Sequence, residues 1–139
     1  MAYIIAVLMA SLSFLLNKLL LYYLGAVTII SAGPVVEEAA KTLFAYYLGA
    51  DIITVHVLFG IIEAGYDWYY RSSDELVAPL LSIVGHSMFG AGTVGILGMT
   101  GSLWLGLAAG ITLHLAYNLT IVKLVANKIA DKPRKRDKP

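Results

Sequence analysis

Stretches of about 20 apolar residues follow one another along this chain, with little polar sequence between them. A helix of that length crosses the hydrocarbon core of a bilayer, which is about 30 Å thick. Hydrophobic residues make up 59% of the 139 residues and charged residues only 14%, against about 25% charged in soluble domains. The chain is therefore predicted to be an all-α polytopic integral membrane protein. We expect a bundle of about five transmembrane spans, forming a single domain over residues 1–130.

The polar and turn-forming residues between the apolar stretches place the spans. We expect spans at 2–24, 34–48, 52–70, 76–99 and 102–126. Asp51 is a favourable N-cap for the third span, and Thr100-Gly101 predicts a tight turn before the fifth. The segment 25–33 has two interpretations, either a re-entrant connector or an extension of a neighbouring helix.

A basic segment ends the chain. Five of its last nine residues are positively charged, namely Lys132, Arg134, Lys135, Arg136 and Lys138. Because basic residues are enriched on the cytoplasmic side of membrane proteins, the C-terminus is predicted to be cytosolic and the N-terminus outside. A tail this short indicates topology or contact with lipid rather than nucleic-acid binding, and 131–139 is predicted to be disordered. The chain contains no cysteine, which excludes disulfide and thiolate chemistry.

Two adjacent glutamates and a lysine interrupt the otherwise apolar second span. Pro34 suits the first turn of a helix, and Glu37 and Glu38 are expected in that same turn, where the helix dipole stabilises carboxylates. Lys41 follows them by four and three residues, so it can pair with either. Each charge inside a membrane costs about 2.5–3.5 kcal/mol on insertion scales, so such residues usually serve a function. A purely structural ion pair is the alternative interpretation.

Further polar residues lie at matching depths in the other spans. With the predicted orientation, Glu63, His86, His114 and Asn118 all fall in the cytosolic half of the membrane. His114 and Asn118 continue a stripe of small residues spaced by four, which would let a neighbouring helix approach closely. We therefore predict that these residues form one site with the glutamate pair. His56 is interpreted as structural, because it would lie near the outer interface.

The residue types limit the chemistry of such a site. The sequence has no Gly-x-Ser-x-Gly elbow, no pair of aspartates suited to a dyad and no His-Glu-x-x-His helix. A buried carboxylate can take a proton from water and pass it to a leaving amine, and histidine can orient that water or bind a metal that activates it. An amide such as that of Asn118 can donate to a developing oxyanion. This combination suits hydrolysis of an amide by activated water.

Four motifs together resemble a known family. They are Glu37-Glu38-x-x-Lys41, Phe59-x-x-x-Glu63, His86 and His114-x-x-x-Asn118. In this order they resemble the CAAX-protease and bacteriocin-processing (CPBP) superfamily of intramembrane proteases, over residues 34–118. The lysine of the first motif and the glutamate of the second resemble its PrsW branch. The prenyl-protease branch has Glu-Glu-x-x-x-Arg and Phe-x-x-x-His instead.

The resemblance implies roles for the acidic residues. Glu37 would be the general base that acts on water, and Glu38 would assist it or pair with Lys41. Glu63 stands where the prenyl-protease branch has a histidine that helps to activate water. His86 would then supply the missing imidazole.

The resemblance also bears on the oxyanion and on a cofactor. His114 and Asn118 would form the oxyanion site. Relatives are described as metalloproteases, and a metal-free glutamate mechanism is argued for them as well. If a divalent ion such as zinc is bound, its expected ligands are Glu63, His86 and His114.

The expected function is an intramembrane endopeptidase that hydrolyses a membrane-anchored peptide or protein in the cytosolic half of the lipid bilayer. The first alternative is a non-catalytic membrane scaffold of the same superfamily. A small proton or ion transporter ranks lower, because the sequence contains no internal repeat of the kind common in transporters. The chain is shorter than most members of the superfamily, so it would be a minimal core or would need a homo-oligomer.

Overall fold

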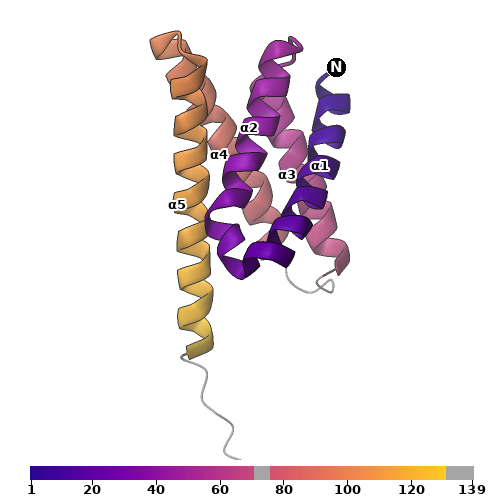
Figure 1. The fold of residues 1–139 in the computed structure, drawn as a ribbon, viewed down its shortest axis with the longest axis vertical. Coiled ribbons are helices and arrows are strands. Elements are labelled where there is room, and N and C mark those ends of the chain that lie inside the picture. The colour runs from indigo at the N-terminus through magenta and orange to yellow at the C-terminus, as the bar shows by residue number, and fades with distance from the viewer. Residues whose placement is uncertain (71–75, 131–139) are drawn as a thin grey trace, which may run out of the picture.

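The computed structural model describes residues 1–70 and 76–130, which are helical apart from short connections and contain no strand. In chain order the elements are α1 (Ala2–Leu24), the 3-10 helix η1 (Gly25–Ile30), α2 (Ala32–Tyr47), α3 (Ile52–Tyr70), α4 (Val77–Thr100) and α5 (Leu103–Ala130). The α-helices run alternately up and down the bundle, and α5 extends past the others (Figure 1). The all-α class is confirmed. The predicted disorder of the tail concerns residues outside the described ranges.

Some of these helices have the length and composition of membrane spans. Val77–Thr100 and Leu103–Leu124 each qualify, and a third span results if the bent pair Lys18–Ile30 and Ala32–Tyr47 counts as one. Many large apolar side chains point outward, for example Leu80 and Leu105, as expected for surfaces that face lipid. A membrane protein with two or three candidate spans is therefore supported, whereas five spans and a cytosolic C-terminus stay predictions.

A sharp bend separates α1 from α2. Gly25 adopts a φ of 69°, in the left-handed region that glycine enters most readily. The axis of Lys18–Ile30, which includes η1, and that of Ala32–Tyr47 differ by 89°, so the bend falls between η1 and α2. At the bottom of Figure 1 the chain turns here from α1 into α2. Residues 25–30 therefore form a 3-10 helix directly after α1, and Ala32 and Gly33 extend α2, so each interpretation holds for part of the segment.

The bend changes where the acidic pair lies in its helix. α2 begins at Ala32, two residues before Pro34, and its first turn carries no acidic residue. Glu37 and Glu38 therefore lie in the second turn. The prediction that they occupy the first turn, next to the positive end of the dipole, was wrong.

The helices pack as a closed arrangement. α4 lies between α3 and α5, α1 packs on α3, and α2 contacts α1, α3 and α5. On α5 the stripe of small residues does permit close packing, because a Cβ on Gly106 would lie 2.7 Å from the carbonyl oxygen of Thr93. An apolar cluster fills the space between α1, α2 and α3. Its members are Ile5, Met9, Ala45, Ile52, Val55 and Phe59.

The predicted ends of two helices are confirmed. Asp51 Oδ1 accepts the backbone N–H of Thr54 at 2.7 Å and its hydroxyl at 2.6 Å, so Asp51 caps α3. Gly101 ends α4 with a φ of 67° and donates its N–H to the carbonyl of Leu97.

Candidate active site

A network of ionisable side chains occupies the interior of the bundle. Its members come from four helices and are each 5% exposed or less: Glu38 and Lys41 on α2, His56 on α3, His86 on α4 and His114 on α5. The prediction that the polar residues of separate helices converge is confirmed for Glu38, His86 and His114, and for Glu63, which contacts His86.

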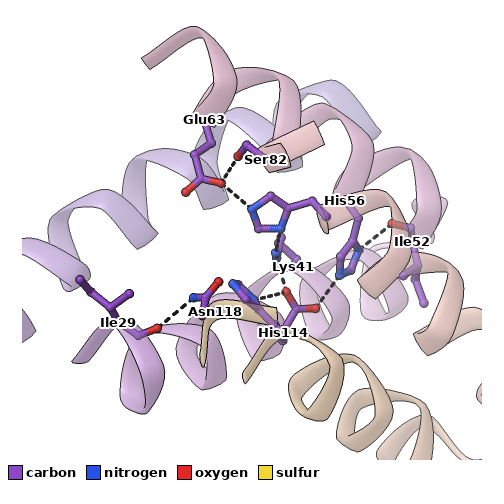
Figure 2. Close-up of polar contacts among 10 residues, drawn as sticks. Ile29, Lys41, Ile52, His56, Glu63, Ser82, His114 and Asn118 are labelled. Carbon is purple, nitrogen blue, oxygen red and sulfur yellow. Dashed lines mark hydrogen bonds and ion pairs between the residues drawn. The ribbon is translucent and has the colours of Figure 1, made fainter. Parts of the chain in front are cut away.

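Glu38 is the centre of this network. Its Oε1 accepts hydrogen bonds from Lys41 Nζ at 2.7 Å and from His114 Nδ1 at 2.9 Å. Its Oε2 lies 2.9 Å from His56 Nε2. Figure 2 draws these bonds together with the surrounding helices. A buried carboxylate requires such partners, since water cannot solvate it there. Glu38 thereby links α2 to α3 and α5.

The two bonds of His86 define its tautomer. Nε2 lies 2.6 Å from Glu63 Oε2, and Nδ1 lies 2.9 Å from Lys41 Nζ. An ammonium only donates and a carboxylate only accepts, so His86 is neutral and carries its proton on Nε2. Both ring nitrogens of His86 thus have hydrogen-bond partners within the protein. Ser82 also donates to Glu63 Oε2, at 2.5 Å.

His114 is oriented by its carboxylate partner in the same manner. Its Nδ1 donates to Glu38, so in the neutral form of the ring the lone pair lies on Nε2. The ring stacks on Phe89 with centroids 4.4 Å apart, and His114 lines a cavity. A histidine held by a carboxylate in this way presents a defined acceptor atom.

Two cavities border the network. The first, of about 290 Å³, is lined by Glu37, Glu63, His86, His114 and Asn118 among others. The second, of about 690 Å³, is mainly apolar and lies between α1 and α3. Glu37 and Glu63 line both cavities. Glu37 is only 7% exposed, and it lines both cavities, whereas Glu38 lines neither of them.

A group of possible metal ligands lies at the first cavity. Glu37, His86 and His114 each offer a ligand atom, and these atoms lie within 4.8 Å of one another. Two histidines and a carboxylate are a common donor set of catalytic zinc. The expected set had Glu63 in place of Glu37 and stays a prediction; Glu63 accepts the N–H of His86. His86 would have to release Lys41 or Glu63 to bind an ion.

Asn118 lies apart from the buried network. Its Nδ2 donates to the carbonyl of Ile29 at 2.9 Å, which ties α5 to η1 (Figure 2). It lines the first cavity together with His114 one turn away. Because an amide nitrogen carries two hydrogens, a second N–H remains for another acceptor. Its oxyanion role stays a prediction.

His56 is the network member that sequence reasoning missed. It was expected near the outer interface, yet it is fully buried against Glu38. One available signal was that His56, Phe59 and Glu63 share a helix face. Another was the short α2–α3 connection, which brings His56 level with Lys41 across the antiparallel pair.

No protein-family model matches this chain, and neither curated proteins nor solved structures yield a significant match. The expected family therefore stays a prediction that rests on the four motifs.

Proposed function

We propose that this protein is an intramembrane peptidase of the CPBP type, closest to the PrsW branch, which hydrolyses a membrane-anchored peptide with activated water. One observation carries the proposal. A buried carboxylate, an oriented imidazole and an amide, from Glu37, His114 and Asn118, line a single cavity of about 290 Å³. Polar groups of these kinds are energetically costly inside an apolar bundle, so they are usually found there because they serve a function.

The two glutamates of the first motif have different roles in this proposal. Glu38 is surrounded by donors from Lys41, His56 and His114, so it orients its neighbours and does not act as the base. Glu37 lines the cavity and acts as the general base: it takes a proton from water and delivers it to the leaving amine. The attacking oxygen of that water forms the new bond to the carbonyl carbon.

The tautomer of His114 decides whether this residue orients the attacking water or binds the oxyanion. With its proton on Nδ1, the neutral ring offers an acceptor at Nε2 and has no donor for an oxyanion. His114 therefore orients the attacking water. The oxyanion falls to Asn118, whose amide can donate.

The same residues are compatible with a metal. Glu37, His86 and His114 would hold the ion, which when bound supplies Lewis acidity and lowers the pKa of bound water. Glu38 and Glu63 hydrogen-bond to the two histidines, the arrangement that orients histidine ligands in metal sites.

The second cavity supports a membrane-anchored substrate. It is mainly apolar, and Glu37 and Glu63 stand between it and the first cavity. An apolar peptide segment that entered between α1 and α3 would reach Glu37 without passing through water. The first cavity is lined from the half of the bundle nearer to η1, which gives no support to a relay across the membrane.

The test is cleavage of a pool of single-span peptides by the purified protein in liposomes, with and without a chelator. We expect Glu37→Gln to lower the rate about 100-fold or more, the scale of general-base catalysis. The matched control is Asp51→Asn, which removes a carboxylate from a helix cap remote from the cavities. Equal rates in Glu37→Gln and native protein, or no cleavage by folded native protein, would refute the proposal. The chelator arm decides whether a metal takes part.

A further inference from the structure

The two hydrogen bonds of His56 determine where its protons lie. Nδ1 is 2.9 Å from the carbonyl oxygen of Ile52, and a carbonyl can only accept, so Nδ1 carries a proton. Nε2 is 2.9 Å from Glu38 Oε2. An ionised carboxylate also only accepts, so Nε2 must carry a proton as well. A neutral imidazole, with one N–H, cannot satisfy both partners.

The surroundings of Glu38 hold it in the ionised form. The ammonium of Lys41 lies 2.7 Å from its Oε1, and His114 donates to the same oxygen. Both Glu38 and Lys41 are fully buried, so neither charge can be compensated by water. A neutral Glu38 would deprive the Lys41 ammonium of its hydrogen-bonded carboxylate, leaving the imidazole of His86 and the ring of Phe59 in direct contact with it.

We propose that His56 is a buried imidazolium that positions the Glu38 carboxylate and, through it, His114. The catalytic part of this inference rests on the proposed peptidase function. His56 binds Oε2 and thereby turns Oε1 toward Lys41 and His114 Nδ1. This arrangement places the lone pair of His114 on Nε2, where the proposed reaction needs an acceptor. His56 is thus a positioning residue and does not touch the substrate.

Close packing keeps the imidazole of His56 in place. A Cβ on Gly90 of α4 would lie 2.8 Å from His56 Cβ and 2.9 Å from His56 Cγ, so only glycine leaves room for the side chain. A Cβ on Gly110 of α5 would lie 3.2 Å from Glu38 Oε2. The His56–Glu38 pair is therefore enclosed by the backbones of two further helices. Its geometry cannot relax freely when one partner is changed.

The chain suits a direct spectroscopic test, because it contains three histidines. In protein labelled with ¹⁵N-histidine, the three imidazoles can be distinguished by NMR and assigned by replacing each histidine in turn. We expect both nitrogens protonated in His56, Nε2 alone in His86 and Nδ1 alone in His114. A native His56 with one unprotonated nitrogen would overturn the proposal. This measurement is independent of activity, so its failure is distinguishable from failure of the peptidase proposal.

Two variants test the positioning role. His56→Gln keeps an N–H donor that can reach Glu38, whereas His56→Leu removes it and leaves a charged acceptor short of a partner. We expect His56→Leu to slow peptide cleavage about tenfold or more and to broaden or shift the His114 Nδ1–H signal. His56→Gln should retain most of the cleavage rate and most of the native His114 Nδ1–H signal. An unchanged His114 signal in folded His56→Leu protein would contradict the positioning role, even if the imidazolium is observed.

Discussion

Two buried regions hold this bundle together by different means. The apolar cluster between α1, α2 and α3 consists of aliphatic side chains and Phe59, and the polar network consists of Glu38, Lys41 and the three histidines. In a bilayer the first region gains little from burial, since lipid tails are as apolar as the side chains themselves. The hydrogen bonds of the second have no replacement in lipid.

This difference indicates which region specifies the arrangement of helices. Apolar contacts can be repacked with similar energy, whereas Glu38 and Lys41 are satisfied only when particular atoms of α3, α4 and α5 reach them. Phe59 belongs to both regions, because it lies in the cluster and its ring centroid is 4.3 Å from Lys41 Nζ. The network therefore acts as the specific part of the core and the cluster as the adaptable part.

The largest effect is expected from removing the buried cation. Lys41→Met leaves the Glu38 carboxylate without its closest charge partner, and we expect a loss of about 3–5 kcal/mol in the free energy of unfolding. The measurement is unfolding of the protein in mixed micelles by a denaturing detergent. Lys18→Met, at an exposed lysine of α1, should change the stability by less than about 0.5 kcal/mol. Equal effects of the two substitutions would remove the distinction between the regions.

A smaller effect is expected in the apolar cluster. Val55 is fully buried there, whereas Val84 on α4 is 52% exposed. Val55→Ala should lower the free energy of unfolding by about 1 kcal/mol, because side chains around the resulting cavity lose packing contacts. Little transfer free energy is lost, since the alternative environment is lipid. Val84→Ala removes the same atoms without opening an interior cavity and should be close to neutral. A cost for Val55→Ala as large as that for Lys41→Met would show that the cluster is not the adaptable region.

The helices and much of the network could be predicted from local signals. Apolar runs of membrane length gave the helices, and Asp51 and Gly101 marked two of their ends. Counting depth along the spans correctly grouped His86 and His114. These inferences succeed because helix rise is constant and polar residues in an apolar bundle must find one another.

What could not be predicted depends on tertiary geometry. The 89° bend between η1 and α2 sets the start of α2 at Ala32, and with it the turn that carries Glu37. Adjacent residues point about 100° apart on a helix, so only the packed structure decides that Glu38 enters the network while Glu37 borders the cavities. The hydrogen bond between His56 and Glu38 depends on the same packing, because the short α2–α3 connection places the two helices side by side without fixing which side chains meet.

The smallest effect is expected at Asp51, in the connection before α3 and outside both regions. Hydrogen bonds from the hydroxyl and then the N–H of Thr54 hold the pKa of Asp51 below its ordinary value of 3.8. Asp51→Ala should therefore lower the free energy of unfolding by about 0.5–1 kcal/mol at neutral pH, at the low end for a cap because the site is exposed. Asp51→Asn should cost less, since asparagine caps nearly as well.

The pH dependence of this effect has a defined sign. Because the folded pKa of Asp51 is lower than the unfolded one, the stabilisation from the ionised cap is present above the unfolded pKa and is lost as the pH falls through the folded pKa. The stability gap between native protein and Asp51→Asn should therefore narrow below about pH 4, near the ordinary aspartate pKa. Unfolding in micelles at several pH values would measure it, and a gap that stays constant would contradict an ionised cap. An effect confined to the cap would also show that stability at this helix end is set locally, unlike at Lys41, where atoms of two other helices contribute.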